Sequence, residues 1–168
     1  MTELPGTPAD LWPDGAAGLL ELPAGTNLWG LHDAGLWVVI PTNLRRKADG
    51  TAVMGAGLAL AAARRFPDLA ARYGDALGAG KGRFVCAEHR LLLAPTKDDW
   101  RRPATVPLVL ELLDAVASWS GRHPDAAVAL SAPGCGRGGL PWAQVRAAAM
   151  TRLAAHRVAL LPPMPAGR

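Results

Sequence analysis

Apolar residues along the chain form short runs that alternate with longer amphipathic stretches, a pattern typical of strands alternating with helices. Leu36 to Ile40 and Ala127 to Leu130 are apolar at every position. Such runs predict strands that are buried on both faces of a sheet. Further short strands are expected at 19–22, 84–86, 91–94 and 158–161.

The helical periodicity appears between these runs. Leu58, Ala62 and Phe66 share one side of a helix expected over 55–66, which Pro67 interrupts before a second piece at 67–77. A longer helix is expected over 105–120, and another from Pro141 to about residue 156. Because strands alternate with helices, the sequence predicts an α/β sandwich with a largely parallel sheet, whose ligands bind beyond the carboxyl ends of strands.

The length of 168 residues fits one domain. We expect a loosely ordered arm at 1–17, rich in Pro and Gly, a single domain at 18–163 and a short tail at 164–168. No apolar run reaches the roughly 18 residues that a bilayer requires, and no basic start precedes an apolar segment. We therefore expect a cytoplasmic monomer with no membrane partner.

The chain carries a net charge of +4 and a pI near 9.7, which favours an anionic partner. Basic residues cluster at 44–47 and 100–102, and the partner is either a nucleotide or a nucleic-acid backbone. Cys86 and Cys135 have no metal-type spacing to each other or to the histidines. Neither a disulfide framework nor a metal site is expected.

A glycine-dense segment, residues 131–142, lies between a predicted strand and a predicted helix. It reads Ser-Ala-Pro-Gly-Cys-Gly-Arg-Gly-Gly-Leu-Pro-Trp. Glycines accept positive φ and let peptide N–H groups converge on an anion, so the segment predicts a phosphate-binding loop. The alternative is a flexible surface turn. The segment matches neither of the common nucleotide-binding glycine patterns.

A second glycine segment, Met54-Gly55-Ala56-Gly57, precedes the first long helix. The free N–H groups at a helix N-terminus attract anions. Together the two segments are suited to hold a diphosphate between them.

Several motifs in order along the chain resemble a macrodomain, and the resemblance covers roughly residues 19–162. The motifs are Pro41-Thr42-Asn43, Val53-Met54-Gly55-Ala56-Gly57-Leu58-Ala59, Arg65-Phe66-Pro67 with Tyr73, Pro95-Thr96-Lys97 with Trp100, and Gly134-Cys135-Gly136-Arg137-Gly138-Gly139-Leu140 with Trp142. Their order and spacing are similar to the branch that removes ADP-ribose from nucleic acid or protein. That branch includes antitoxin macrodomains that reverse DNA ADP-ribosylation.

The resemblance implies a three-layer α/β/α sandwich with a central mixed, largely parallel sheet, and a cleft for ADP-ribose. It assigns the catalytic role to Lys97 and places Asn27 near the adenine. The other implied substrate-binding residues are Thr42, Asn43, Val53, Met54, Gly55, Ala56, Gly57, Gly134, Cys135, Gly136, Arg137, Gly138, Gly139 and Leu140. Some lysine-dependent relatives carry an aspartate where this chain has Gly138, so we expect no lysine–aspartate pair here.

Lys97 has two chemical roles open to it. As a neutral amine it can attack the anomeric carbon or its ring-opened aldehyde, and as an ammonium it can stabilise charge on the leaving group. Cys135 has no neighbouring histidine in the sequence to form a thiolate, so we interpret it as a packing residue.

The sequence thus predicts an ADP-ribosyl hydrolase that needs no cofactor, with ADP-ribose on a modified nucleobase or protein side chain as its ligand. A cognate ADP-ribosyltransferase is the partner that the resemblance implies. Two alternatives stay open: a module that only binds ADP-ribose, and a phosphatase acting on ADP-ribose 1''-phosphate.

Overall fold

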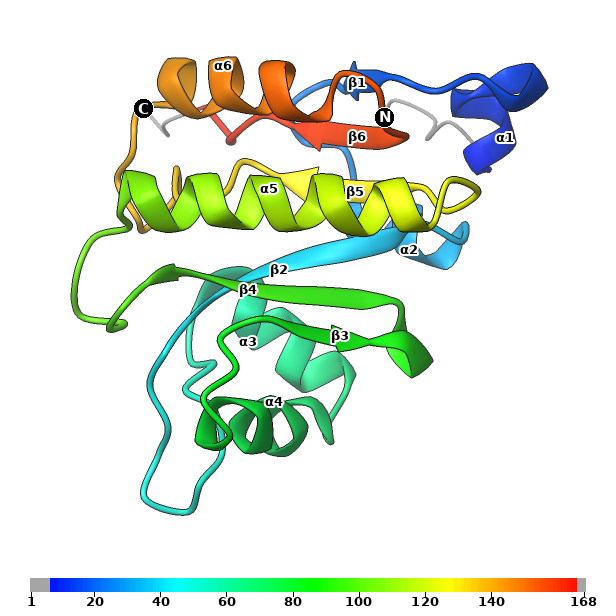
Figure 1. Cartoon of the computed structure of the whole chain (residues 1–168). Coiled ribbons are helices and arrows are strands. Elements are labelled where there is room, and N and C mark those ends of the chain that lie inside the picture. The colour runs from blue at the N-terminus through cyan, green and yellow to red at the C-terminus, as the bar shows by residue number, and fades with distance from the viewer. Residues whose placement is uncertain (1–6, 166–168) are drawn as a thin grey trace.

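The computed structural model describes residues 7–165, and a six-stranded sheet forms their centre (Figure 1). The strand order is β1-β6-β5-β2-β4-β3, and all neighbours are parallel except β3 and β4. The strands are β1 (Leu19–Glu21), β2 (Trp37–Asn43), β3 (Phe84–Cys86), β4 (Leu91–Lys97), β5 (Val128–Ser131) and β6 (Val158–Leu161). The mixed, largely parallel sheet is confirmed.

Helices cover both faces of this sheet. The first layer contains α2 (Leu28–Asp33), α3 (Gly57–Arg65) and α4 (Leu69–Gly78), which pack into one buried apolar cluster. The second contains α5 (Val106–Arg122) and α6 (Trp142–Leu153), which pack into another on the opposite face (Figure 1). The short helices are α1 (Pro8–Leu11), η1 (Pro13–Gly15) and η2 (Ala87–His89). The three-layer α/β/α sandwich is therefore confirmed.

The observed elements differ from the predicted ones in two places. Thr42 and Asn43 lie beyond the apolar run 36–40 that predicts the strand, but they pair with β4 and belong to β2. The helix α2 was not predicted, because its six residues are too few to show a helical period; its only sequence signal is Asn27, whose side chain caps it by accepting from Gly30 N–H at 3.2 Å.

The described part of the predicted N-terminal arm, residues 7–17, is anchored to the domain. Trp12 is only 3% exposed and packs in the first apolar cluster. Its indole Nε1–H donates to the Gly18 carbonyl at 2.7 Å, and the Arg157 Nε–H donates to the Ala16 carbonyl at 2.9 Å. The prediction of a loose arm is wrong for these residues, since one buried indole outweighs a composition rich in Pro and Gly. The remainder of the arm, 1–6, and residues 166–168 of the tail lie outside the described residues.

A turn that follows β2 packs directly on α4. A Cβ added to Gly74 would lie 2.1 Å from the Gly50 carbonyl oxygen, closer than any real contact. At Gly78, on the same helix, an added Cβ would meet only the end of the flexible Arg46 side chain, at 2.6 Å. The close approach of turn and helix therefore requires glycine at position 74.

We expect Gly74→Ala to lower the free energy of unfolding by about 3 kcal/mol, because the turn has to move away from α4. Gly78→Ala is the matched control, and it should change stability by less than about 1 kcal/mol. Urea denaturation of both variants measures the difference. Equal stabilities would show that the turn does not pack on Gly74 in solution.

No helix in the 7–165 range is both long and apolar enough to cross a bilayer.

Candidate functional site

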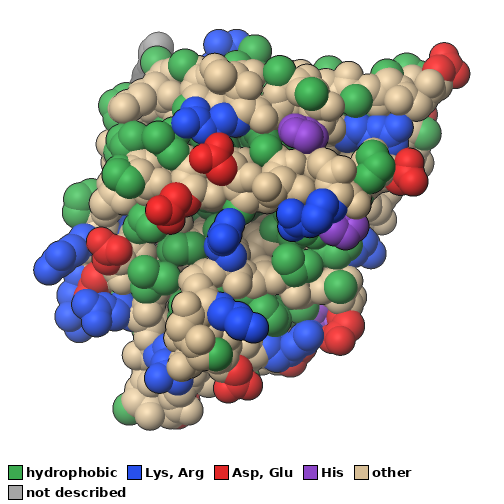
Figure 2. Space-filling view, viewed as in Figure 1, with side chains coloured by type: hydrophobic (Ala, Val, Ile, Leu, Met, Phe, Trp, Pro, Cys, Tyr) green, Lys and Arg blue, Asp and Glu red, His purple; other side chains and the backbone are tan. Residues whose placement is uncertain are grey.

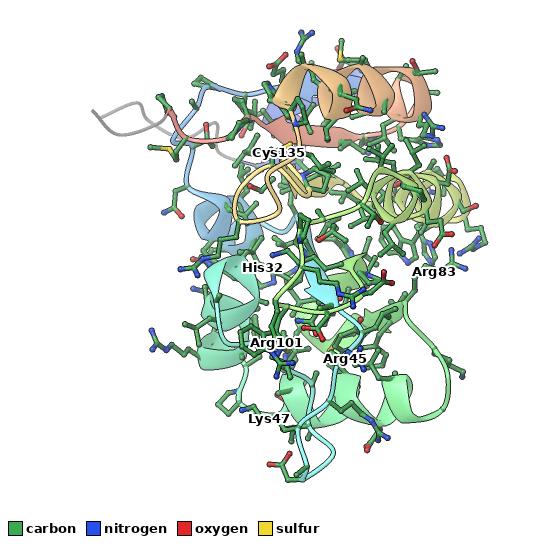
Figure 3. The ribbon with its side chains drawn as sticks, turned by 90° about the vertical axis from the view of Figure 1, so that its left-hand side faces the viewer. His32, Arg45, Lys47, Arg83, Arg101 and Cys135 are labelled. Atoms are coloured by element: carbon green, nitrogen blue, oxygen red, sulfur yellow. The ribbon has the colours of Figure 1, made fainter. Side chains whose placement is uncertain are left out.

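The carboxyl ends of β5, β2 and β4 meet at one edge of the sheet. Because these strands are parallel neighbours with β2 in the middle, the segments that follow them are brought together there. The segment after β5 is the glycine loop, and β4 ends at Lys97. Figure 3 looks onto this edge, with Cys135 above and Arg45, Arg101 and Lys47 below.

The first glycine segment leaves a series of peptide N–H groups without partners. None of the N–H groups of Met54 to Ala59 donates to an acceptor within residues 7–165, whereas Val53 and Leu60 on either side do donate. Gly57, the first residue of α3, has a φ of +55°, a conformation that glycine adopts at little cost. This series of donors at a helix N-terminus is suited to an anion.

The glycine loop after β5 presents a second set of donors. Its own hydrogen bonds, from Leu140 N–H to the Gly134 carbonyl at 2.9 Å and from Gly139 N–H to the Gly136 carbonyl at 3.1 Å, fix its shape. The N–H groups of Gly136, Arg137 and Gly138 have no acceptor in the described part of the chain. Three consecutive donors on a fixed backbone form a recognised type of anion site.

Gly138 allows no side chain in this conformation. A Cβ there would lie 2.5 Å from the Gly134 carbonyl oxygen and 2.6 Å from Ala104 Cβ. The Gly138 carbonyl also accepts the Ala104 N–H at 3.0 Å, which ties the glycine loop to the segment after β4. An aspartate at this position would therefore require a different loop conformation.

Asn43 positions the first glycine segment. Its Nδ2 donates to the Val53 carbonyl at 3.0 Å, and its Oδ1 accepts the Arg45 N–H at 2.9 Å. The amide thus holds both ends of a hairpin, residues 44–53, that extends from the sheet (Figure 1, cyan loop). Because both polar groups of its amide are hydrogen-bonded, Asn43 fixes the position at which the first glycine segment begins.

An ion pair joins this hairpin to the segment after β4. Arg45 Nε lies 3.1 Å from Asp99 Oδ2, and the other carboxylate oxygen accepts the Arg101 N–H at 2.9 Å. The hydrogen bond from Arg101 N–H, with the positive charges of Arg101, Arg45 and Arg102, lowers the pKa of Asp99. The carboxylate therefore stays ionised and connects the two segments that flank Lys97.

Removing this charge should loosen the connection without breaking the fold. We expect Asp99→Asn to weaken ligand binding at this edge by at most about fivefold, because Arg45 is largely exposed and exposed ion pairs contribute little. Asp98→Asn is the matched control, since the exposed Asp98 makes no ion pair in residues 7–165. Calorimetric titration of both variants compares them, and a loss with Asp98→Asn alone would contradict the assignment.

Lys97 is the last residue of β4 and pairs in register with Asn43. Its side chain is partly exposed, and its ammonium has no hydrogen-bond or ion-pair partner in the described part of the chain. An amine that is not engaged by the protein is available to a ligand held by the neighbouring N–H groups. The structure thus brings Lys97 and both glycine segments to one edge of the sheet.

The other predicted residues take different positions. Thr42 is buried, and its hydroxyl bonds at 2.7 Å to the hydroxyl of Tyr73, whose burial raises its pKa to about 12. The Thr42 hydroxyl therefore connects β2 to α4 in the buried part of the domain. Asn27 caps α2, and Arg137 is exposed at the tip of the glycine loop.

Cys135 packs against the second apolar cluster, as does Leu140. The Cys135 thiol points to the Pro133 carbonyl at 3.6 Å, and burial raises its pKa. A raised thiol pKa disfavours the thiolate, which agrees with a packing role.

Sequence reasoning missed Asp99 and its pairing with Arg45. Asp99 follows Asp98 in a Lys-Asp-Asp-Trp run, and nothing in the sequence distinguishes the two acids. Trp100 beside them is 51% exposed, with the Arg101 guanidinium 4.8 Å from its ring centre. This exposed pair at the edge provides a stacking surface.

The fold is shared with solved structures over most of the chain, although no model of a known family and no curated protein matches it. It is 29% identical to the macrodomain of Thermus aquaticus DarG, with a TM-score of 0.69, and the match covers 88% of this chain and 100% of that one. The macrodomain of Mycobacterium tuberculosis DarG is 26% identical, with a TM-score of 0.70, over 87% and 99% of the two chains. Thermosipho africanus DarTG, solved in complex with ADP-ribose, is 22% identical, with a TM-score of 0.69, over 90% of this chain and 42% of that one.

These matches agree with the mixed, largely parallel sheet and the helices on both of its faces. The chain therefore has the macrodomain fold and resembles the DarG branch of macrodomains.

Proposed function

We propose that this protein binds ADP-ribose at the carboxyl edge of its sheet and removes it from a modified nucleobase or protein side chain. The observation that carries the proposal is the presence of two sets of unpaired N–H groups, at 54–59 and 136–138, at the same edge as Lys97. The first set includes the start of α3, and the second set precedes α6. These two helices lie on opposite faces of the sheet, so the two sets approach the edge from its two sides. A diphosphate bridges such a pair of sites well.

The similarity to DarG macrodomains supports the same ligand. The Thermosipho protein of the same fold is solved with ADP-ribose, and the two DarG macrodomains are between 26% and 29% identical to this chain. A nucleic acid that carries ADP-ribose is the first substrate to test. The basic residues at the edge, including Arg45 and Arg101, suit the phosphates of such a substrate.

Lys97 could act in the hydrolysis in two ways, because its amine is not engaged by another residue of 7–165. As a nucleophile, the neutral amine would form a bond from Nζ to the anomeric carbon while the bond to the carrier breaks, and the proton lost from Nζ would pass to the leaving group. Opening of the ribose ring would turn this adduct into a Schiff base, and water would then release ADP-ribose from Lys97. As an ammonium, it would stabilise the negative charge that develops on the leaving group. Reduction with borohydride during turnover traps the first of these as a covalent adduct on Lys97, and the second yields none.

Two measurements on the purified protein test the proposal. Calorimetric titration should show binding of ADP-ribose, and incubation with ADP-ribosylated DNA and with ADP-ribosylated protein should release free ADP-ribose from one of them. Binding without release from either substrate would favour a reader module. Release of phosphate from ADP-ribose 1''-phosphate, without release of ADP-ribose from a macromolecule, would favour the phosphatase.

A further inference from the structure

A hollow of about 350 Å³ lies on the face that carries α5 and α6, away from the edge with Lys97. Its floor is formed by β4 and β3, and one wall is formed by α5. Arg83, which precedes β3, and Arg122, which ends α5, both line it, together with Val85 and Ala115. Figure 2 shows this face of the molecule, and Figure 3 shows Arg83 on the side of the sheet that carries α5.

The helical layer ends before it reaches β3. Val39, Leu92 and Val85 are paired across β2, β4 and β3, so their side chains form one row on this face. The first two are at most 7% exposed, but Val85 is 47% exposed. In Figure 1, α6 and α5 lie side by side over the sheet, and no helix of residues 7–165 follows over β4 and β3.

The open part of this face lies over the edge strand. Leu92 and Ala94 of β4 are at most 7% exposed and pack in the same cluster as α5, whereas Val85 of β3 is 47% exposed. On α5, Ala115 and Ser118 face the hollow three residues apart, and such small side chains allow a second helix to approach closely. The hollow is thus open to a helix that lies beside α5 and over Val85.

The charges at the hollow indicate which side chains a bound helix would carry beside its apolar face. Arg83 and Arg122 are exposed, neither forms an ion pair with any residue of 7–165, and no acidic residue lines the hollow. An apolar floor between two free cations complements apolar side chains flanked by carboxylates. The lining of the hollow includes two cations, Arg83 and Arg122, whereas a nucleic acid is bound through contacts to many phosphates.

We propose that the hollow is a docking site for an amphipathic, acidic helix of a protein partner. The apolar side of the helix contacts Val85 and Ala115, and its carboxylates pair with Arg83 and Arg122. This surface is separate from the edge that carries Lys97, so the docking site stands whether or not the proposed hydrolysis is correct.

The test uses designed helical peptides of about five turns with leucines along one side. One peptide carries glutamates on both flanks, one carries lysines, and one carries the glutamates with a central proline that breaks the helix. Backbone amide chemical shifts of the full chain report where each peptide binds. We expect only the intact glutamate peptide to shift the signals of Val85, Ala115 and Ser118.

Reversing the charges at the hollow then tests which protein residues pair with the peptide. The double variant Arg83→Glu with Arg122→Glu should weaken the glutamate peptide at least tenfold, and the lysine peptide should gain binding to that variant. Arg64→Glu makes the same kind of charge change on α3, on the opposite face, and should leave both affinities unchanged. Thermal unfolding of each variant confirms that it is folded.

Several results would overturn the proposal. These are an unchanged affinity in the double variant, equal binding of the proline peptide, and shifts confined to the edge around Arg45 and Arg101. Shifts at the hollow caused by a single-stranded oligonucleotide but not by the peptide would assign the surface to nucleic acid. Concentration-dependent self-association that Val85→Glu abolishes would assign it to a second copy of this chain.

Discussion

Lys97→Ala should reduce the rate of ADP-ribose release by about 10²–10³-fold while the affinity for free ADP-ribose changes by less than about threefold. The reason is that our proposal assigns binding and chemistry to different groups. The N–H groups at 54–59 and 136–138 belong to the backbone and stay in place when the lysine side chain is removed, whereas the amine is the group next to the reacting sugar in our proposal. Binding and chemistry should therefore separate cleanly.

Single-turnover release from the ADP-ribosylated substrate, together with calorimetry, measures both quantities. Lys81→Ala is the matched control, because Lys81 is an exposed lysine in the turn after α4 and should leave the rate unchanged. Release at the full rate by Lys97→Ala would remove Lys97 from the mechanism and leave the proposed ligand standing. A loss of binding in that variant would instead show that the lysine holds the ligand.

Gly138→Ala should lower both the stability of the protein and its affinity for ADP-ribose, the latter by at least about tenfold. The new Cβ would lie 2.5 Å from the Gly134 carbonyl oxygen and 2.6 Å from Ala104 Cβ, so the loop has to shift. Overpacking of this kind costs about 1–3 kcal/mol. The shift also moves the three N–H donors that the proposal assigns to phosphate.

Gly136 provides the controls in the same loop. An added Cβ at Gly136 meets nothing within 4 Å, so Gly136→Ala should keep the melting temperature of the parent. Gly136→Glu should also keep it but lose ADP-ribose binding, since a carboxylate repels the diphosphate. Undiminished binding by Gly136→Glu would refute the placement of phosphate at this loop, and a stable Gly138→Ala with parental affinity would show that the loop adapts.

Most of the elements could be predicted because their signals are local. Apolar runs predict β5, β6 and the centre of β2, and Pro67 separates α3 from α4 as expected. The prediction failed where a signal was short or distant. The six-residue helix α2 shows no period, and Trp12 is held by a buried contact that composition does not reveal.

The glycine segments and Lys97 could be singled out because glycine patterns and their order along the chain are properties of the sequence. The contacts that hold these residues in place could not be predicted from the sequence. Asn43 holds a hairpin closed, and Asp99 pairs with Arg45, which lies far earlier in the chain. An ion pair between segments that follow two different strands exists only once the strands are paired.

Local patterns were enough to predict the α/β class, the two glycine segments and the resemblance to macrodomains, since periodicity and glycine placement act within a few residues. Three features became visible only in the folded chain: Gly138 excludes a side chain, Asp99 rather than Asp98 connects the site, and the helical layer stops short of Val85. Each of these depends on the distance between segments far apart in the chain, and the strand order β5-β2-β4-β3 sets that distance.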